Sequence, residues 1–497
     1  MLFRSMIIHT KALVKIMGML SVISGFSMIF PLIVGAVYKE ESSVTAFTRT
    51  IVASLILGLL LILLSHRIKG SKRFTHLKTR DAFLIVALTW ILFSAIAAFP
   101  YIIQGCVPRY IDAFFEASSG FTTTGSSILT NVEILPRSMM FWRMFAHWLG
   151  GMGILVLAIA LLPQLGINGQ AIVNAETPGP TLSKVTPKMS DTARTLYLTY
   201  FAFTVAETIL LMMGGLDFFD SITHTFATVG TGGFSSYNDS VAHFQSAYVD
   251  GVFTLFMILS GINFNLYFLT FKGGISKLLK DSELQAYLIF IGGATLLLTL
   301  YLYLGDFYDT LGKAFRYSIF QAASITTTTG FATADFDLWP AFCVMILLFL
   351  YFAGGCSSST GGGIKIVRIL IILKMIKRAA LLRLHPNALI PIRLDDRPLP
   401  GDTIQSISSF VFFYITILFS VGMLVSLDGY DVVTSFSAAA TCLGNIGPGF
   451  HDIGPTMNFS GFSDPVKLLL SFTMIAGRLE LFTLLMLLSR KFWNPTH

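Results

Sequence analysis

The sequence predicts an all-α polytopic membrane protein, with a two-helix N-terminal hairpin followed by four membrane–pore–membrane repeats around a pseudo-fourfold central pore. Three observations predict this fold. Hydrophobic residues make up 54% of the 497 residues and charged residues only 12%, which leaves too little polar surface to cover a soluble protein of this size. A short segment of glycine and threonine recurs along the chain, and basic residues gather in alternate loops between apolar stretches.

The recurring segment defines the repeats. It occurs four times, with neighbouring copies about 100 residues apart, and such a period indicates repeated structural units. Each copy follows a short apolar stretch and precedes a long one. The copies are residues 119–126 (SGFTTTGS), 227–235 (ATVGTGGFS), 324–333 (SITTTTGFAT) and 442–450 (CLGNIGPGF).

The chain begins with an accessory hairpin, residues 1–70. Arg4, Lys11 and Lys15 precede an apolar run to about residue 37, a pattern similar to a signal peptide. No small-residue cleavage site follows, and a second apolar span over about residues 47–64 comes at once, so we expect an uncleaved anchor. Neither span carries a glycine–threonine segment.

Each repeat is expected to contain a first span, a half-helix that is too short to cross the bilayer, and a second span after the glycine-containing segment. The repeats occupy residues 71–190, 191–281, 282–398 and 399–497. First spans are expected at about residues 82–103, 196–213, 284–304 and 404–427. Half-helices are expected at about 111–118, 218–228, 311–325 and 432–442, and second spans at about 139–162, 248–271, 339 onward and 466–488.

The charged residues fit this topology, because basic residues are enriched in cytoplasmic loops. Arginine and lysine gather at about residues 66–80, 184–194, 272–280, 374–397 and 490–491, which places both termini in the cytoplasm. Aspartates gather in the expected outer loops, where they would concentrate cations at the mouth of a pore. They are Asp217, Asp220, Asp239, Asp250, Asp306, Asp309, Asp335, Asp337, Asp428 and Asp431.

Glycine-containing segments at membrane depth point to a cation filter. Non-helical backbone in a bilayer leaves carbonyl groups unpaired, which costs roughly several kcal/mol per group unless a partner satisfies them. A partly dehydrated cation is such a partner, and glycine can turn its carbonyl inward because it adopts positive φ without a Cβ clash. Threonine hydroxyls can add ligands and hold the segment. Four such segments about one axis would form a ring of carbonyl oxygens, which is the construction of a potassium filter.

The second span of repeat 3 is interrupted by residues 353–363 (AGGCSSSTGGG). A helix through five glycines would lose up to about 1 kcal/mol at each, relative to alanine. We therefore expect a flexible polar loop that can obstruct the pore and act as a movable gate, with a packing kink or an ordinary connecting loop as the alternative. The loop residues are Gly354, Gly355, Cys356, Ser357, Ser358, Ser359, Thr360, Gly361, Gly362 and Gly363.

Arg478 is a charge inside the last span, where an arginine costs at least about 2.5 kcal/mol. A salt bridge to Glu480 is disfavoured, because residues two apart on a helix do not face each other, although a bridge to another buried acid stays open. We expect Arg478 to face the pore below the filter. Its charge would raise the barrier to a cation there, and its donors could hold the loop as part of the gate.

Other polar residues leave alternatives open. Lys365 and Arg368 are expected to be interfacial, snorkelling residues, and His147 a hydrogen-bonded packing histidine rather than a proton carrier. Glu116 and Glu207 could each be a buried pairing partner or a coupling site.

The basic stretch 374–397 is either a docking surface for a regulatory partner or only a topology signal. The cysteines Cys106, Cys343, Cys356 and Cys442 show no CxxC and no ligand-like spacing, which favours buried thiols over disulfides or zinc ligands.

These motifs resemble those of a known family. Residues 115–125 (FEASSGFTTTG), 326–330 (TTTTG) and 445–449 (NIGPG) are similar to the pore segments of the TrkH/Ktr/HKT potassium-uptake superfamily. The N-terminal hairpin, 147–153 (HWLGGMG) and 361–365 (GGGIK) point to its TrkH branch, and the resemblance covers essentially the whole chain. It implies a filter that faces outward, a homodimer, and a cytoplasmic regulatory subunit of the TrkA kind that binds the nucleotide in place of this chain.

By the same resemblance, K⁺ would be bound at the carbonyls of four filter segments. The second segment is the weakest match, because Gly230, Gly232 and Gly233 permit a register shifted by one residue. Glycine rather than serine in the first segment is the potassium-preferring form of the family. The expected filter residues are Thr123, Thr124, Gly125, Thr231, Gly232, Gly233, Thr328, Thr329, Gly330, Asn445, Ile446 and Gly447.

The sequence therefore predicts potassium uptake across a bacterial cytoplasmic membrane through a gated pore, with K⁺ as the transported ion and no prosthetic group. The alternative is a proton- or sodium-coupled secondary transporter (a symporter), which would predict paired inverted repeats. An intramembrane hydrolase ranks far lower, because no nucleophile–base or paired-carboxylate motif appears, and we expect no enzymatic activity. The net charge of +7 comes from membrane-flanking loops and does not indicate a nucleic-acid partner.

Overall fold

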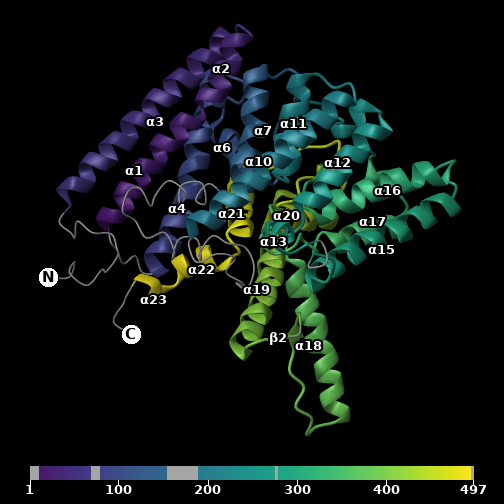
Figure 1. Cartoon of the computed structure of the whole chain (residues 1–497). Coiled ribbons are helices and arrows are strands. Elements are labelled where there is room, and N and C mark those ends of the chain that lie inside the picture. The colour runs from purple at the N-terminus through teal and green to yellow at the C-terminus, as the bar shows by residue number, and fades with distance from the viewer. Residues whose placement is uncertain (1–9, 69–78, 154–188, 275–277, 396, 494–497) are drawn as a thin grey trace.

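The computed structural model describes residues 10–68, 79–153, 189–274, 278–395 and 397–493, and this part of the chain is almost entirely helical (Figure 1). Six of its helices are long and apolar enough to cross a membrane, and a bent helix pair would make a seventh span. The prediction of an all-α polytopic membrane protein is confirmed. Of the expected inner-loop residues, Lys184, Lys188 and those within 69–78 and 275–277 lie outside the described residues.

The N-terminal hairpin packs through small residues. Helices α1 (Thr10–Ser27) and α2 (Ile29–Val37) are followed by α3 (Glu41–Arg67), which runs back along them (Figure 1). A Cβ at Gly18 would lie 2.8 Å from the carbonyl oxygen of Gly58. The glycines thus let the two backbones approach closely, as small residues do between membrane helices.

Four units of one pattern follow the hairpin, and their half-helices agree closely with the expected ranges. The first helices are α4 (Thr79–Ala97) with its extension α5 (Phe99–Gln104), α10 (Met189–Met213), α15 (Ser282–Leu304) and α19 (Gly401–Val425). The half-helices are α6 (Tyr110–Phe121), α11 (Phe218–Val229), α16 (Leu311–Thr326) and α20 (Val432–Gly444). The second helices begin with α7 (Arg137–Gly151), α12 (Ala247–Ser260), α17 (Ala341–Leu350) and α21 (Asp464–Arg478).

The units pack in a closed order around their half-helices. Helix α7 of the first unit packs on α11 of the second, α12 packs on α16, and α21 of the fourth unit packs on α6 of the first. Between the third and fourth units, the Tyr351 hydroxyl donates to the carbonyl oxygen of Pro448 at 2.7 Å. Helix α6 is buried from Ala113 to Phe121, so the half-helices lie inside the bundle.

Two second helices that the sequence predicted as continuous spans are broken. In the second unit α12 ends at Ser260, and α13 (Phe264–Gly273) leaves at an angle of 88°. In the fourth unit α21 ends at Arg478, and α22 (Phe482–Leu488) follows two residues with positive φ, Glu480 and Leu481. The prediction of unbroken spans over 248–271 and 466–488 was therefore wrong. In the first unit α7 ends at Gly151, and the remainder of the predicted span, 154–162, lies outside the described residues.

The break that the sequence did predict, in the third unit, separates α17 from α18 (Ile366–Leu384). Helix α18 extends beyond the helical body beside the lower part of α19 (Figure 1). It leads into a small antiparallel hairpin, β1 (Arg393–Leu394) and β2 (Arg397–Pro398). The shorter elements are η3 (Ser240–Phe244), η4 (Phe336–Leu338), η5 (Ser426–Asp428), η6 (His451–Ile453) and α23 (Arg490–Trp493).

Candidate functional site

The four half-helices end in the same way. At each end one residue adopts the left-handed conformation, and the amide of the next residue bonds the carbonyl oxygen five positions back, as in Thr124 N–H to Ser119 O at 2.9 Å. Threonine is an uncommon residue for this conformation, since its branched side chain crowds the backbone. The left-handed residues are Thr123 (φ 55°), Thr231 (φ 54°), Thr328 (φ 59°) and Asn445 (φ 55°).

A glycine with positive φ stands two residues after each of these positions. The φ of Gly233 is 76°, whereas Gly230 has φ −70° and Gly232 is not in the left-handed region. Gly233 therefore occupies the backbone position of the other three glycines, and the register without a shift is the one in the structure. The other three are Gly125 (φ 84°), Gly330 (φ 83°) and Gly447 (φ 112°).

Each of these glycines lies against the residue before the next glycine, and the four contacts form a closed ring. A Cβ added to any of the four would lie less than 3.0 Å from the carbonyl oxygen of the residue before the next glycine. The order of these approaches is Gly125 to Gly232 O, Gly233 to Thr329 O, Gly330 to Ile446 O and Gly447 back to Thr124 O. We call residues 124–125, 232–233, 329–330 and 446–447 the carbonyl ring. Only glycine leaves room for it, because any side chain would displace a backbone carbonyl.

The electrostatics of the ring favour a cation. Each half-helix ends at the ring, and a helix carries roughly half a negative charge at its C-terminal end. The half-helix Glu116 does not add a free charge, because it pairs with Arg143 at 2.8 Å with both side chains buried. Of the two alternatives for Glu116, a pairing partner is therefore confirmed. Glu207 is fully buried on α10, which packs on α11.

The threonine hydroxyls hold the backbone behind the ring. Thr122 Oγ1 lies 2.7 Å from Thr124 Oγ1, and the pair Thr327 and Thr329 repeats this at 2.8 Å. The amide of Asn445 crosses between units and donates to Thr124 Oγ1 at 2.9 Å. Thr122 and Thr327 were not among the predicted residues, although the runs of threonine in the sequence could have indicated them.

Residues 354–363, which we call the glycine–serine loop, lie against the inner ends of the half-helices. A Cβ at Gly361 would lie 2.8 Å from the carbonyl oxygen of Thr327, and one at Gly362 would lie less than 3.0 Å from that of Gly444. The Gly362 N–H donates to Thr328 Oγ1 at 2.7 Å. The loop therefore lies against two of the segments that build the ring.

Glu283 at the start of α15 fastens the loop from one side. Its carboxylate accepts the Ser357 N–H at 2.6 Å, the Ser357 hydroxyl at 2.9 Å and the Val367 N–H at 3.3 Å. Cys356 N–H also donates to Gly261 O at 2.8 Å, at the break in the second unit. Glu283 was missed from the sequence, where it and Asp281 stand at the edge of an apolar run.

Lys365 is a second anchor, and the expectation that it snorkels at the interface was wrong. Its side chain is 1% exposed, and its ammonium donates to Ser359 Oγ at 3.3 Å and to the carbonyl oxygen of Gly361. Arg368 is also buried. It pairs with Glu480, and its guanidinium lies 3.8 Å from the centre of the Phe410 ring. Lys365 is held by the loop that directly precedes it, and Arg368 by residues from distant segments, and a snorkelling rule based on position in the helix foresees neither.

Arg478 joins the glycine–serine loop to the first unit. Its guanidinium donates to the carbonyl oxygens of Thr360 at 2.7 Å, Gly150 at 2.6 Å and Gly151 at 2.8 Å. It therefore holds the loop at Thr360, as expected of its donors. Its neighbour Glu480 pairs with Arg368 instead.

Several of the aspartates that were predicted to lie at the mouth are engaged in structural contacts. Asp250 pairs with Arg316 at 2.7 Å, and Asp217 and Asp431 cap α11 and α20. Asp337 in η4 accepts the N–H of His451 at 2.7 Å, which ties the third unit to the fourth. Burial raises the pKa of Asp337 to about 6.

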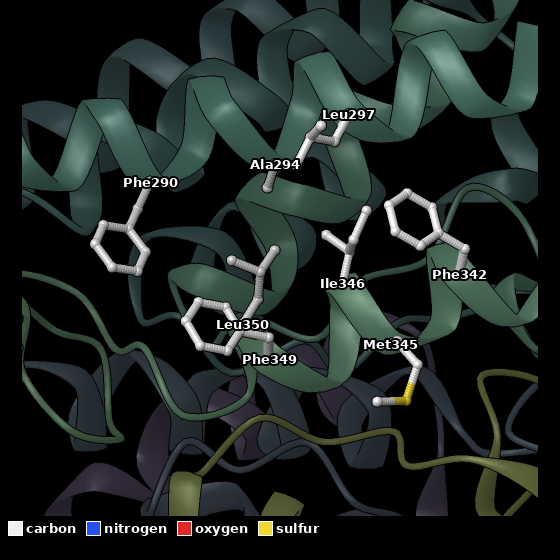
Figure 2. Close-up of a pocket in the computed structure, with 8 residues that line it drawn as sticks. All are labelled: Phe290, Ala294, Leu297, Phe342, Met345, Ile346, Phe349 and Leu350. Atoms are coloured by element: carbon white, nitrogen blue, oxygen red, sulfur yellow. The ribbon is translucent and has the colours of Figure 1, made fainter.

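A pocket of about 280 Å³ lies between α15 and α17, away from the ring. Its lining is entirely apolar, and Figure 2 shows Phe290, Ala294, Phe342 and Phe349 among the side chains around it. Since it offers no oxygen ligand, it is unsuited to an ion. In the described part of the chain the four cysteines are free thiols, and no cluster of three metal-ligating side chains occurs.

Comparison with known proteins agrees with this architecture. The family model TrkH, described as a cation transport protein, matches residues 43–494. The Trk system potassium uptake protein TrkH of Escherichia coli K12 is 36% identical over 490 residues, covering 98% of this chain and 100% of that protein. TrkH of Halomonas elongata is 33% identical over 487 residues, which cover 97% of this chain and 99% of the relative.

The fold is also similar to a solved structure. The crystal structure of the potassium transporter TrkH from Vibrio parahaemolyticus matches with a TM-score of 0.87 and 33% identity, over 98% of this chain and 100% of that one. The match extends from the hairpin through all four units. With the family model and these full-length relatives in agreement, the chain belongs to the TrkH family of cation transport proteins.

Proposed function

We propose that this protein takes up potassium across the bacterial cytoplasmic membrane through a channel-like pore whose filter is the carbonyl ring. The observation that carries the proposal is the closed head-to-tail approach of four glycines and four carbonyl oxygens. The relatives are named for potassium uptake, which identifies K⁺ as the ion. The carbonyl oxygens of the ring are the groups that would bind it. Transport, and not an enzymatic reaction, is the activity that follows.

The ring suits K⁺ because its oxygens can replace part of the hydration shell of the ion. Backbone carbonyls at membrane depth need such a partner, since water is absent there. The converging half-helix ends add negative potential at the same place. Thr124, Thr329 and Asn445 hold the carbonyls through hydrogen bonds behind the ring, which keeps the oxygens spaced for one size of ion.

In this proposal the glycine–serine loop and Arg478 form the gate and close the pore. The loop lies at the inner side of the ring, and the guanidinium adds a positive charge on the path of a cation. Opening requires the loop to leave Thr328 and Arg478 to release Thr360.

Control of the gate would come from a cytoplasmic nucleotide-binding subunit of the TrkA kind that docks on α18 and the β1–β2 hairpin. A chain of contacts leads from this hairpin to the loop. Asp395 accepts the Ser282 N–H at 3.1 Å, and the next residue, Glu283, holds Ser357. In the same proposal two copies of the chain form a homodimer, and both termini lie in the cytoplasm.

The test is ion flux into liposomes that contain the purified protein, comparing K⁺, Rb⁺, Na⁺ and Li⁺ for the wild type and Gly330→Ser. The proposal predicts fast K⁺ and Rb⁺ flux, with discrimination against Na⁺ lowered by the substitution. Flux that requires an imposed proton or sodium gradient and is indifferent to Gly330→Ser would support the coupled transporter instead.

A further inference from the structure

The second segment of the carbonyl ring differs from the other three. The residue before the ring glycine is Thr124, Thr329 or Ile446 in three units but Gly232 in the second. The backbone does not require a glycine there, since Gly232 is not in the left-handed region and its three counterparts carry side chains in the same place. Another group must therefore occupy the space behind this segment.

The imidazole of His147 occupies that space. A Cβ at Gly232 would lie less than 3.0 Å from three atoms of the His147 ring, Cγ, Nδ1 and Cδ2. His147 belongs to α7 of the first unit and is fully buried. Its backbone is also close to the second segment, because a Cβ at Gly230 would lie 2.6 Å from the His147 carbonyl oxygen.

The ring of His147 is fixed on both sides. Nδ1 lies 2.8 Å from the carbonyl oxygen of Gly120, and because a carbonyl can only accept, Nδ1 carries the proton. The neutral imidazole then leaves Nε2 without a proton, and this nitrogen has no hydrogen-bond partner within the described part of the chain. On the other side, the centres of the His147 and Phe234 rings are 4.3 Å apart.

From this arrangement we infer that His147 is the positioning residue of the second filter segment and takes the place of the side chain that Gly232 lacks. It bonds the Gly120 carbonyl at the end of the first half-helix and packs against the backbone of Gly232. The neutral tautomer does so without adding a positive charge beside the filter. The inference rests on the proposed function, since it assigns His147 a part in ion discrimination.

The His147 imidazole and a side chain at position 232 would occupy the same space, so one can replace the other but both cannot be present. Gly232→Thr alone adds a side chain where the imidazole already lies, so we expect a loss of folded protein. His147→Ala alone empties the space, and the second segment loses its support. The double variant His147→Ala/Gly232→Thr moves the side chain back to the place it has in the first and third units, and should recover part of what each single change loses.

The experiment measures the K⁺/Na⁺ flux ratio in liposomes together with the amount of folded protein. For His147→Ala we expect the ratio to fall roughly tenfold, because one buried hydrogen bond with its packing is worth about 1.4 kcal/mol. His147→Asn, whose side-chain amide can still donate to Gly120, should retain most of the selectivity. The double variant should exceed His147→Ala in selectivity and Gly232→Thr in folded yield.

Two outcomes overturn the inference. If His147→Ala keeps the wild-type flux ratio while Gly330→Ser loses it, the filter stands and His147 has no part in it. If the double variant is no better than the sum of its single changes, the two residues do not share one space. Failure of the proposed function is distinct from both, because the wild type would then show no K⁺-selective flux.

Discussion

The carbonyl ring and the glycine–serine loop are in contact, yet they are held by different kinds of interaction. The ring is built four times from backbone: a left-handed residue, a backbone hydrogen bond five positions back, and a glycine against the next carbonyl. The loop occurs once, and side chains from three other places hold it, namely Glu283, Arg478 and Thr328. A few side-chain contacts can be released while the ring stays intact, so ion selection and gating should be separable.

The largest effect is expected from adding a side chain to the ring. Gly233→Ala forces a Cβ to within 3.0 Å of the Thr329 carbonyl oxygen and adds strain of roughly 1–2 kcal/mol from the left-handed conformation. K⁺-selective flux should be lost. Gly429→Ala is the matched control, because its φ of 86° is also positive but a Cβ there would meet no atom within 4 Å. Equal damage from both substitutions would contradict the importance of the close carbonyl.

Removal of Arg478 should open the gate without changing selection. Arg478→Ala deletes three hydrogen bonds from a charged donor, each worth about 1.5–3 kcal/mol. We expect K⁺ flux without a regulatory subunit to rise at least about tenfold, since each 1.4 kcal/mol is a factor of ten. The K⁺/Na⁺ ratio should not change. Arg109→Ala serves as the control, because Arg109 is 57% exposed and pairs with Asp464 on the outer side.

A smaller rise in K⁺ flux is expected when Glu283, which also holds the glycine–serine loop, is changed. Glu283→Gln keeps the shape of the side chain but loses the charge that attracts three donors, two from Ser357 and one from Val367. Flux should rise by roughly threefold to tenfold, since these three hydrogen bonds are weakened by the loss of the charge and not removed. The exposed outer substitution Asp309→Asn should have no effect on flux. A fall in flux with Glu283→Gln would mean that the loop must be held for the pore to conduct.

The smallest effect concerns the link between the third and fourth units at the outer mouth. Burial raises the pKa of Asp337 from 3.8 to about 6, so the folded protein binds this proton more tightly than the unfolded chain. Its contribution to stability is therefore greatest below about pH 4 and is lost as the pH rises through about 6. Asp337→Asn should flatten the pH dependence of the unfolding temperature between these values. An unchanged slope would show that other groups cause it.

The sequence predicted the parts of the carbonyl ring that depend on local backbone requirements. The half-helices and the four ring glycines could be placed because runs such as Thr326–Gly330 combine small residues, glycine and a fixed period. Even the uncertain second segment follows the same rule, with Thr231 and Gly233 in the left-handed region. Each of these features depends on residues that are adjacent in the sequence.

Features imposed by contacts between units were not visible in the sequence. The break after Arg478 runs through Glu480 and Leu481, which adopt positive φ although neither is glycine. The burial of Arg368 depends on Glu480, which is 112 residues away in the sequence. Such residues have ordinary sequence patterns, so only the folded structure reveals their partners.

The separation of selection from gating is tested most directly by the reversal potential of the open pore between K⁺ and Na⁺ solutions. The wild type, Arg478→Ala and Gly330→Ser would be measured in the same bilayer. We predict that Arg478→Ala conducts more than the wild type at an unchanged reversal potential, while Gly330→Ser shifts the reversal potential toward zero. A shift of similar size in Arg478→Ala would contradict the account, because the gate contacts would then also set the filter.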